Sequence, residues 1–178
     1  MTLRMTRESL AETRRSVWNL RPPSLEGSDL IEALQNLLSR PLSGGATAHF
    51  SLWGAPWPLA PDVESALLRV TQEALSNVNR HSHANDVWVE MIFEPESIQL
   101  HIRDNGQGFD PQSLNKPTLP VYQQWGGFGL IGMCERIEAF GGHLTIESES
   151  QQGVHVYVVI PHQNAAFALM RVAHESSH

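Results

Sequence analysis

Short stretches in which apolar and polar residues alternate predict the strands of this chain. They occupy residues 46–52, 87–91, 98–102, 144–146 and 154–158. The last two are expected to pair as a hairpin across the turn at residues 151–153. Because alternation leaves one side of each strand apolar, we expect a sheet with one buried face.

Apolar residues spaced three or four positions apart predict helices over residues 2–20, 29–38, 62–81 and 130–140. The second helix opens with Asp29, and Glu32 follows three residues later, which is the spacing of a capping box. The third gives the strongest signal, with Val63, Leu67 and Val70 on its apolar face.

The first predicted helix, residues 2–20, has a weak apolar seam. Leu3, Leu10 and Val17 recur every seven residues, and Pro22-Pro23 cannot continue the helix. A single helix cannot bury its own stripe, so this one packs either on its own domain or against a partner helix.

Two segments carry no clear periodicity. Residues 110–126 contain three prolines and end in Gly126, and a loop of this length in a compact domain is usually functional, often a lid. Residues 162–178 form a tail that we expect to be either a short helix or disordered.

Composition narrows the class of protein. The 178 residues suit one domain with an appendage, and a net charge of −7 argues against a nucleic-acid-binding surface. The single cysteine, Cys134, cannot form an internal disulfide and fits a reducing compartment. No apolar run reaches membrane-spanning length, so a cytoplasmic location is expected.

The first candidate for chemistry follows the strand at 98–102. There Asp104, Gly106 and Gly108 stand at alternate positions. The acid supplies a directional acceptor, and the glycines let the backbone approach a ligand closely. The same pattern also occurs in ordinary loops, so by itself it is weak evidence.

A second candidate lies on the helix at 62–81, where Glu73, Asn77 and His81 are spaced by four. Such a row can be a solvated helix face. It can also serve a hard cation, because Mg²⁺ takes oxygen ligands and shares its shell with substrate phosphates. His81 and His83 have no further ligand set that would indicate zinc.

The third candidate opens the helix at 130–140, where Gly127, Gly129 and Gly132 precede or enter it. Glycines at a helix start can present free N–H groups to phosphate, and they can equally serve close packing.

Taken in order, these three motifs resemble those of the ATP-binding domain of sensor histidine kinases. Glu73-x-x-x-Asn77-x-x-x-His81 is similar to the N box, and Asp104-x-Gly106-x-Gly108 to the first glycine box. Gly127-x-Gly129-Leu130-x-Gly132-Met133 is similar to the second. The resemblance covers about residues 30–161 and implies a two-layer α/β sandwich, with helices on one face of a mixed sheet.

The resemblance also implies roles for individual residues. Asp104 would accept from the adenine amino group and select ATP over GTP, and Asn77 would ligate Mg²⁺. Glu73 would act as a base or orient the incoming histidine, and Arg80 and His81 would lie near the phosphates. The remaining residues would shape the pocket or contact the nucleotide: Gly106, Gly108, Gly127, Gly129, Leu130, Gly132 and Met133.

The segment from Leu10 to Leu25 is similar to the second dimerisation helix of the nitrate-sensor-like subfamily. The expected organisation is therefore a dimerisation remnant and linker at 1–25, an ATP-binding domain at 26–161 and the tail at 162–178. The parent would be a homodimer that passes the γ-phosphoryl group of ATP to a histidine and then to a response-regulator aspartate. Whether it is anchored in the inner membrane stays open.

Two departures from the family pattern stand out. No histidine followed by an acid occurs before Leu10, so we do not expect this chain to phosphorylate itself at the usual place. Val154 replaces a frequent threonine, which removes one pocket hydroxyl. Three other functions stay open: a serine kinase of the anti-sigma type, an ATPase module of the topoisomerase and mismatch-repair kind, and a degenerate regulatory domain.

Overall fold

The computed structural model describes residues 29–109 and 128–162. The predictions for the first helix, for the lid at 110–126 and for the tail after His162 lie outside these residues. Among the described residues, no helix has the length and apolar character needed to cross a membrane.

Five strands form one sheet in the order β1-β2-β3-β5-β4. Their bounds are Thr47–Gly54 for β1, Asp86–Phe93 for β2, Ser97–Asp104 for β3, His143–Ser148 for β4 and Val154–Pro161 for β5. β1 pairs with β2 in parallel, whereas the other three pairs are antiparallel. The sheet is therefore mixed, as predicted, and every predicted strand is confirmed.

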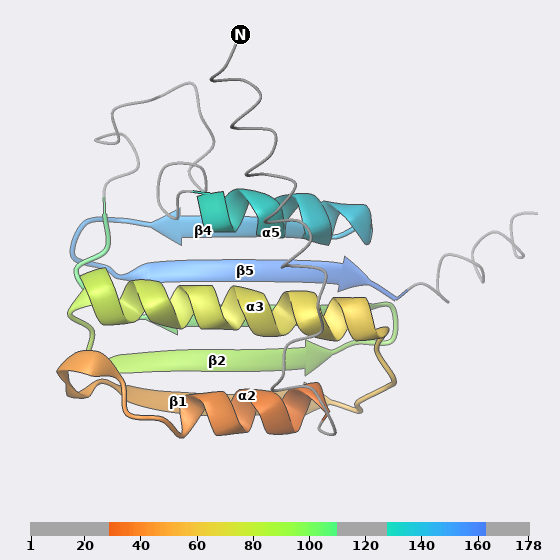
Figure 1. Cartoon of the computed structure of the whole chain (residues 1–178), viewed down its shortest axis with the longest axis horizontal. Helices are drawn as coiled ribbons and strands as arrows, with labels where there is room; N and C mark the ends of the chain where they lie inside the picture. The colour runs from red at the N-terminus through yellow and green to blue at the C-terminus, as the bar shows by residue number, and fades with distance from the viewer. Residues whose placement is uncertain (1–28, 110–127, 163–178) are drawn as a thin grey trace, which may run out of the picture.

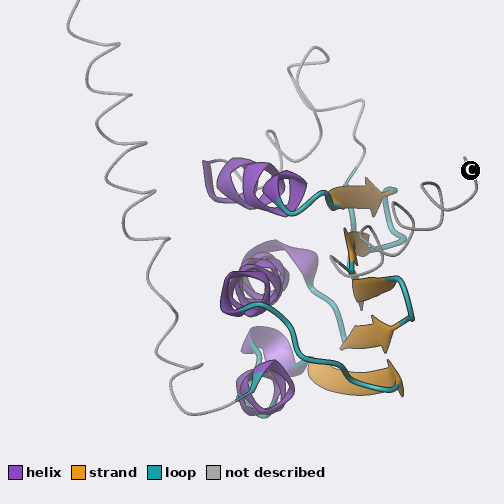
Figure 2. Ribbon diagram, turned by 90° about the vertical axis from the view of Figure 1, so that its right-hand side faces the viewer, coloured by secondary structure: helices purple, strands orange, loops and turns teal. Residues whose placement is uncertain are grey.

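Within residues 29–109 and 128–162, three α-helices cover one face of this sheet: α2 at Leu30–Leu38, α3 at Pro61–Asn77 and α5 at Phe128–Ala139. Figure 2 shows the helices in one layer and the strands in the other, which confirms the two-layer α/β sandwich. A short 3₁₀ turn, η2 at Ser43–Gly45, precedes β1, and a π-helical turn, η3 at Val78–Ser82, follows α3.

Residues at the helix ends explain where the helices begin and stop. The Asp29 side chain accepts from the N–H of Glu32 at 2.8 Å, so the predicted N-cap of α2 is confirmed. Pro61 occupies the first turn of α3, where its missing N–H costs nothing. The helix predicted over 62–81 is correct in place, but its α-helical part ends at Asn77 and the last turn is η3.

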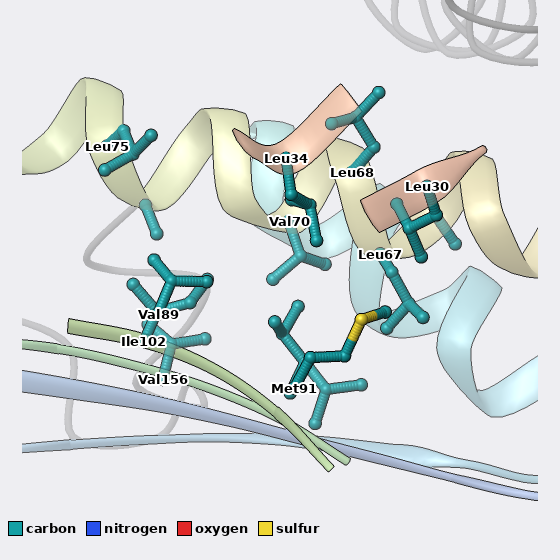
Figure 3. Close-up of a cluster of buried hydrophobic side chains, with 14 of the residues drawn as sticks. Leu30, Leu34, Leu67, Leu68, Val70, Leu75, Val89, Met91, Ile102 and Val156 are labelled. Atoms are coloured by element: carbon teal, nitrogen blue, oxygen red, sulfur yellow. The ribbon is translucent and has the colours of Figure 1, made fainter. Parts of the chain in front are cut away.

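The core lies between the two layers. Leu34 of α2 and Leu67 of α3 meet Met91 of β2 there, and all three side chains are fully buried (Figure 3). The inward residues of the strands alternate with outward ones, as in β3, where Ile98, Leu100 and Ile102 are buried. The other face of the sheet is not covered by any described element (Figure 2).

The C-terminal end of α3, the end of β3 and the turn between β4 and β5 all lie at one end of the sheet, on the left in Figure 1. This end, called the site end below, holds the residues of the first two motifs.

Candidate functional site

Asp104 is the last residue of β3 and continues the buried side of that strand. It follows Ile98, Leu100 and Ile102 in the alternation, so its carboxyl group lies on the helix-covered face and only 4% of the residue is exposed. Its Oδ1 accepts a hydrogen bond from the N–H of Gly106 at 2.8 Å. The strand pattern that buries the core thus also buries one acid.

The surroundings of Asp104 pull its pKa in two directions. Burial raises the pKa of this carboxyl above its ordinary value, and hydrogen bonds from the backbone N–H groups of Gly106 and Val154 partly offset the rise. The net direction is upward. A buried carboxylate so held keeps acceptor capacity for one further polar partner.

Gly106 is required by packing. A Cβ at this position would collide with the Ser82 carbonyl oxygen and lie 2.7 Å from Oδ1 of Asp104. The turn after β3 therefore presses against the end of the helix that carries the N-box motif. Gly108, at φ 55°, meets the β4–β5 turn in the same way, because its Cβ would collide with the carbonyl oxygen of Glu149.

Gly153 belongs to the same arrangement, although the sequence indicated it only as part of a hairpin turn. Its φ is 79°, and a Cβ there would collide with the carbonyl oxygen of Asp104. It ends the predicted turn at residues 151–153 and directly precedes Val154, whose N–H bonds to Asp104. The carboxyl of Asp104 is thus enclosed by two turns that are far apart in the sequence.

Asn105 fixes the start of β2 and was also not predicted. Its Oδ1 accepts from the N–H groups of Asn85 and Asp86, both at 2.9 Å, and its Nδ2 donates to Asp86 at 3.3 Å. An asparagine directly after a strand is a frequent turn former, which is the signal that could have indicated it.

Gln107 joins three segments. Its backbone N–H donates to the Ser82 carbonyl at 2.7 Å, and its Nε2 donates to the His81 carbonyl at 2.6 Å. Its own carbonyl accepts from the N–H of Gln151 at 2.6 Å. The turn between the two glycines is thereby attached to the N-box helix and to the β4–β5 turn.

Asn77, the last residue of α3, is buried with 4% of its surface exposed. Among the described residues, its Nδ2 has no hydrogen-bond partner. An amide group left unpaired in the interior costs roughly 1–3 kcal/mol. The unpaired nitrogen is a donor that fits an acceptor on a ligand, and the oxygen of the same amide is of the type that Mg²⁺ takes.

The other N-box residues lie in two different environments. Glu73 is partly buried one α-helical turn before Asn77, whereas Arg80 and His81 are exposed on η3. Because a π-helical turn changes the spacing, the α-helical row ends at Asn77, and His81 does not continue it.

The second glycine motif forms the start of α5. Gly129, Leu130, Gly132 and Met133 all lie within this helix, and Gly127 lies outside the described residues. The prediction that these residues contact a nucleotide stays a prediction.

A separate hollow of about 740 Å³ lies on the uncovered face of the sheet. Its lining includes Trp88, Arg103 and His155, which point away from the face that holds Asp104. We therefore place the candidate site at the buried polar groups of the site end and not in this hollow.

Cys134 on α5 is an unsuitable nucleophile. Burial, together with Glu138 and Glu135, raises the pKa of its thiol to about 12, so the thiol stays protonated near neutral pH. We therefore assign no chemistry to this thiol.

Comparison with known proteins adds an independent line of evidence. DegS of Brevibacillus brevis, named a signal transduction histidine-protein kinase/phosphatase, is 32% identical over 159 residues, covering 89% of this chain and 39% of DegS. UhpB of Salmonella typhimurium, with the same descriptive name, is 35% identical over 150 residues, covering 83% of this chain and 28% of UhpB. The chain thus spans less than half the length of these relatives.

Solved structures agree on the fold. The mycobacterial sensor histidine kinase MprB superposes with a TM-score of 0.54 at 22% identity, covering 74% of this chain and 93% of that one. The family model that matches residues 62–164 is described as histidine kinase-, DNA gyrase B- and HSP90-like ATPase. The match includes α3, η3 and all strands after β1, and the chain therefore belongs to this ATPase family.

Proposed function

We propose that this chain is the ATP-binding catalytic domain of a two-component sensor histidine kinase. The observation that carries the proposal is the pair of buried polar groups, Asp104 and Asn77, at the site end of a domain from this ATPase family. The relatives named histidine-protein kinase/phosphatase support a histidine kinase over a serine kinase or a topoisomerase-type module.

Asp104 would recognise adenine. Its buried carboxylate has Oδ1 held by Gly106 and can accept a further hydrogen bond, which the exocyclic amino group of adenine would donate. Guanine presents a carbonyl oxygen in the corresponding place, and two acceptors facing each other repel. ATP would therefore be preferred over GTP.

Asn77 would act at the phosphate end, holding Mg²⁺ through Oδ1, and the ion when bound would neutralise phosphate charge. Glu73, one helical turn away, would orient the incoming histidine or accept its proton. Arg80 and His81 would lie beside the phosphates. These residues position groups and balance charge, which is most of what phosphoryl transfer requires of a protein.

The same proposal extends to the parent protein. Residues 1–25 would be the end of a dimerisation helix with its linker, 26–161 the catalytic domain and 162–178 a tail. The acceptor histidine would lie on a further helix of a cytoplasmic, homodimeric kinase region, and a response-regulator aspartate would take the phosphoryl group from it.

Calorimetric titration of the chain with ATP, with and without Mg²⁺, tests the role of Asn77. Replacing Asn77 by alanine should lower Mg-ATP affinity about tenfold and change metal-free ATP affinity little, because one oxygen ligand is lost. The exposed Asn36 on α2 provides the matched control, Asn36→Ala, which should bind as the unsubstituted chain does. An unchanged Mg²⁺ dependence in Asn77→Ala would remove the assigned role.

Incubation of the full-length parent with radiolabelled ATP tests the reaction. Phosphohistidine is labile in acid and stable in alkali, so acid-labile label on the protein is the expected result. Acid-stable label would indicate a serine kinase, and hydrolysis without protein label would indicate an ATPase module.

A further inference from the structure

The C-terminal end of the N-box helix is closed by a residue from another segment. The last carbonyl groups of any helix lack partners within the helix. Here the helix ends in η3 at Ser82, and His83 leaves it in the left-handed conformation at φ 51°. Carbonyl groups at this end therefore need donors from elsewhere.

Gln107 supplies two of these donors. Its backbone N–H bonds to the carbonyl of Ser82 at 2.7 Å, and its side-chain Nε2 bonds to the carbonyl of His81 at 2.6 Å. The side-chain bond can be removed by a substitution that leaves the backbone bond in place. It fixes the carbonyl of the residue that immediately follows Arg80.

The adenine side of the candidate site does not depend on this side chain. Asp104 is held by the backbone N–H groups of Gly106 and Val154. Gln107 also keeps two backbone bonds, to Ser82 and Gln151, after any change of its side chain. Loss of the Gln107 amide should therefore affect η3 and leave the Asp104 carboxyl in place.

We propose that Gln107 is a positioning residue, whose side-chain amide caps η3 and so places Arg80 and His81 for the phosphates of the nucleotide. The inference rests on the proposed function, since it assigns the phosphates to this turn. Gln107, the residue between Gly106 and Gly108, would thus serve the phosphate end of the site and not the adenine end.

The test compares ATP with adenosine, which lacks phosphates, as ligands of the whole chain. Gln107→Met keeps the length of the side chain and removes the donor. We expect ATP affinity to fall about three- to tenfold, the size usual for one hydrogen bond, with adenosine affinity unchanged. Gln107→Asn, whose shorter side chain cannot span the same distance, should give the same pattern.

The matched control is Gln152→Met, an exposed glutamine on the neighbouring turn whose amide bonds to Glu149 at 2.7 Å. It should leave both affinities unchanged. Equal losses of ATP and adenosine affinity in Gln107→Met, or no loss of either, would overturn the inference while leaving the proposed function standing. Failure of the unsubstituted chain to bind ATP would overturn both.

Discussion

The two ends of the sheet are built with the same backbone devices and differ in what they bury. At the site end, Gly153 at φ 79° fits against the carbonyl of Asp104. At the opposite end, Gly54, also at φ 79°, fits against the carbonyl of Phe93. In both places a Cβ would collide with a neighbouring strand, so a tight glycine alone does not identify a site.

The groups around the two glycines make the difference. At the opposite end Trp57 stacks on His162 with ring centroids 3.8 Å apart and donates its indole N–H to Glu94 at 3.1 Å. Its hydrogen-bonding group is thus paired within the protein. At the site end Asp104 is buried and the buried Asn77 has an Nδ2 without a described partner. Buried polar groups with spare capacity are therefore the better mark of a ligand site.

The largest effect is expected from replacing either glycine. Gly153→Ala and Gly54→Ala should each lower the free energy of unfolding by about 2–4 kcal/mol, because both add a steric collision at positive φ. Urea titration measures this loss. Under conditions in which both variants are folded, only Gly153→Ala should also weaken ATP binding. Equal ATP affinity in the two variants would contradict the difference between the two ends of the sheet.

Trp57→Ala should cost about 2–3 kcal/mol of stability, since it removes packing against Phe93 and His162 from a partly buried position. ATP affinity should not change, because the residue lies at the other end of the sheet. Trp57→Phe, which retains an aromatic ring and loses only the bond to Glu94, should cost about 1 kcal/mol. A loss of ATP affinity in either variant would show that the two ends are not independent.

The smallest expected effect is the change in ligand affinity when Asp104 loses its charge. Adenosine is the suitable ligand for measuring it, because adenosine has no phosphate group that titrates. Asp104→Asn should weaken adenosine binding about tenfold at neutral pH. In the unsubstituted chain, the raised pKa means that Asp104 takes up its proton at a higher pH than an ordinary aspartate. Adenosine affinity should therefore fall in mildly acidic solution, and the variant should lack this part of the pH dependence.

The pH dependence that Asp104 gives to folding stability runs in the opposite direction from the pH dependence it gives to adenosine binding. Its pKa is higher in the folded chain than the ordinary value of 3.8, so the folded state binds the proton more tightly. The contribution of Asp104 to stability is consequently largest at low pH and declines as pH rises from about 3.8 through the raised pKa. Urea titrations across this range should show the decline, and Asp104→Asn should remove it. Identical pH profiles for the two chains would contradict the raised pKa.

Local patterns in the sequence predicted the elements and part of the site. Apolar residues that recur every two positions predicted the strands, and apolar residues that recur every three or four positions predicted the place of α3. These predictions succeeded because the repeating apolar residues are the ones that face the core. The Asp104 motif was found because its strand, acid and glycines are contiguous. The predictions for residues 110–127 lie outside the described structure.

The parts not predicted depend on contacts between distant segments. Gly153 is needed because the chain about fifty residues earlier carries Asp104, and no local pattern contains that fact. Gln107 caps a helix end more than twenty residues earlier, and the change from α- to π-helical spacing after Asn77 has no sequence signature that we recognise.

The attachment of the β4–β5 turn limits how this chain can lengthen during evolution. Hairpin turns commonly accept inserted residues, but this one is bonded through Gln151 to Gln107 and contacts Asp104 through Gly153. An insertion there would displace Gly153 from the carbonyl of Asp104. The turn before β1 is more permissive, because Gly44 and Gly45 have open space around them, so homologous chains with extra residues should carry them there.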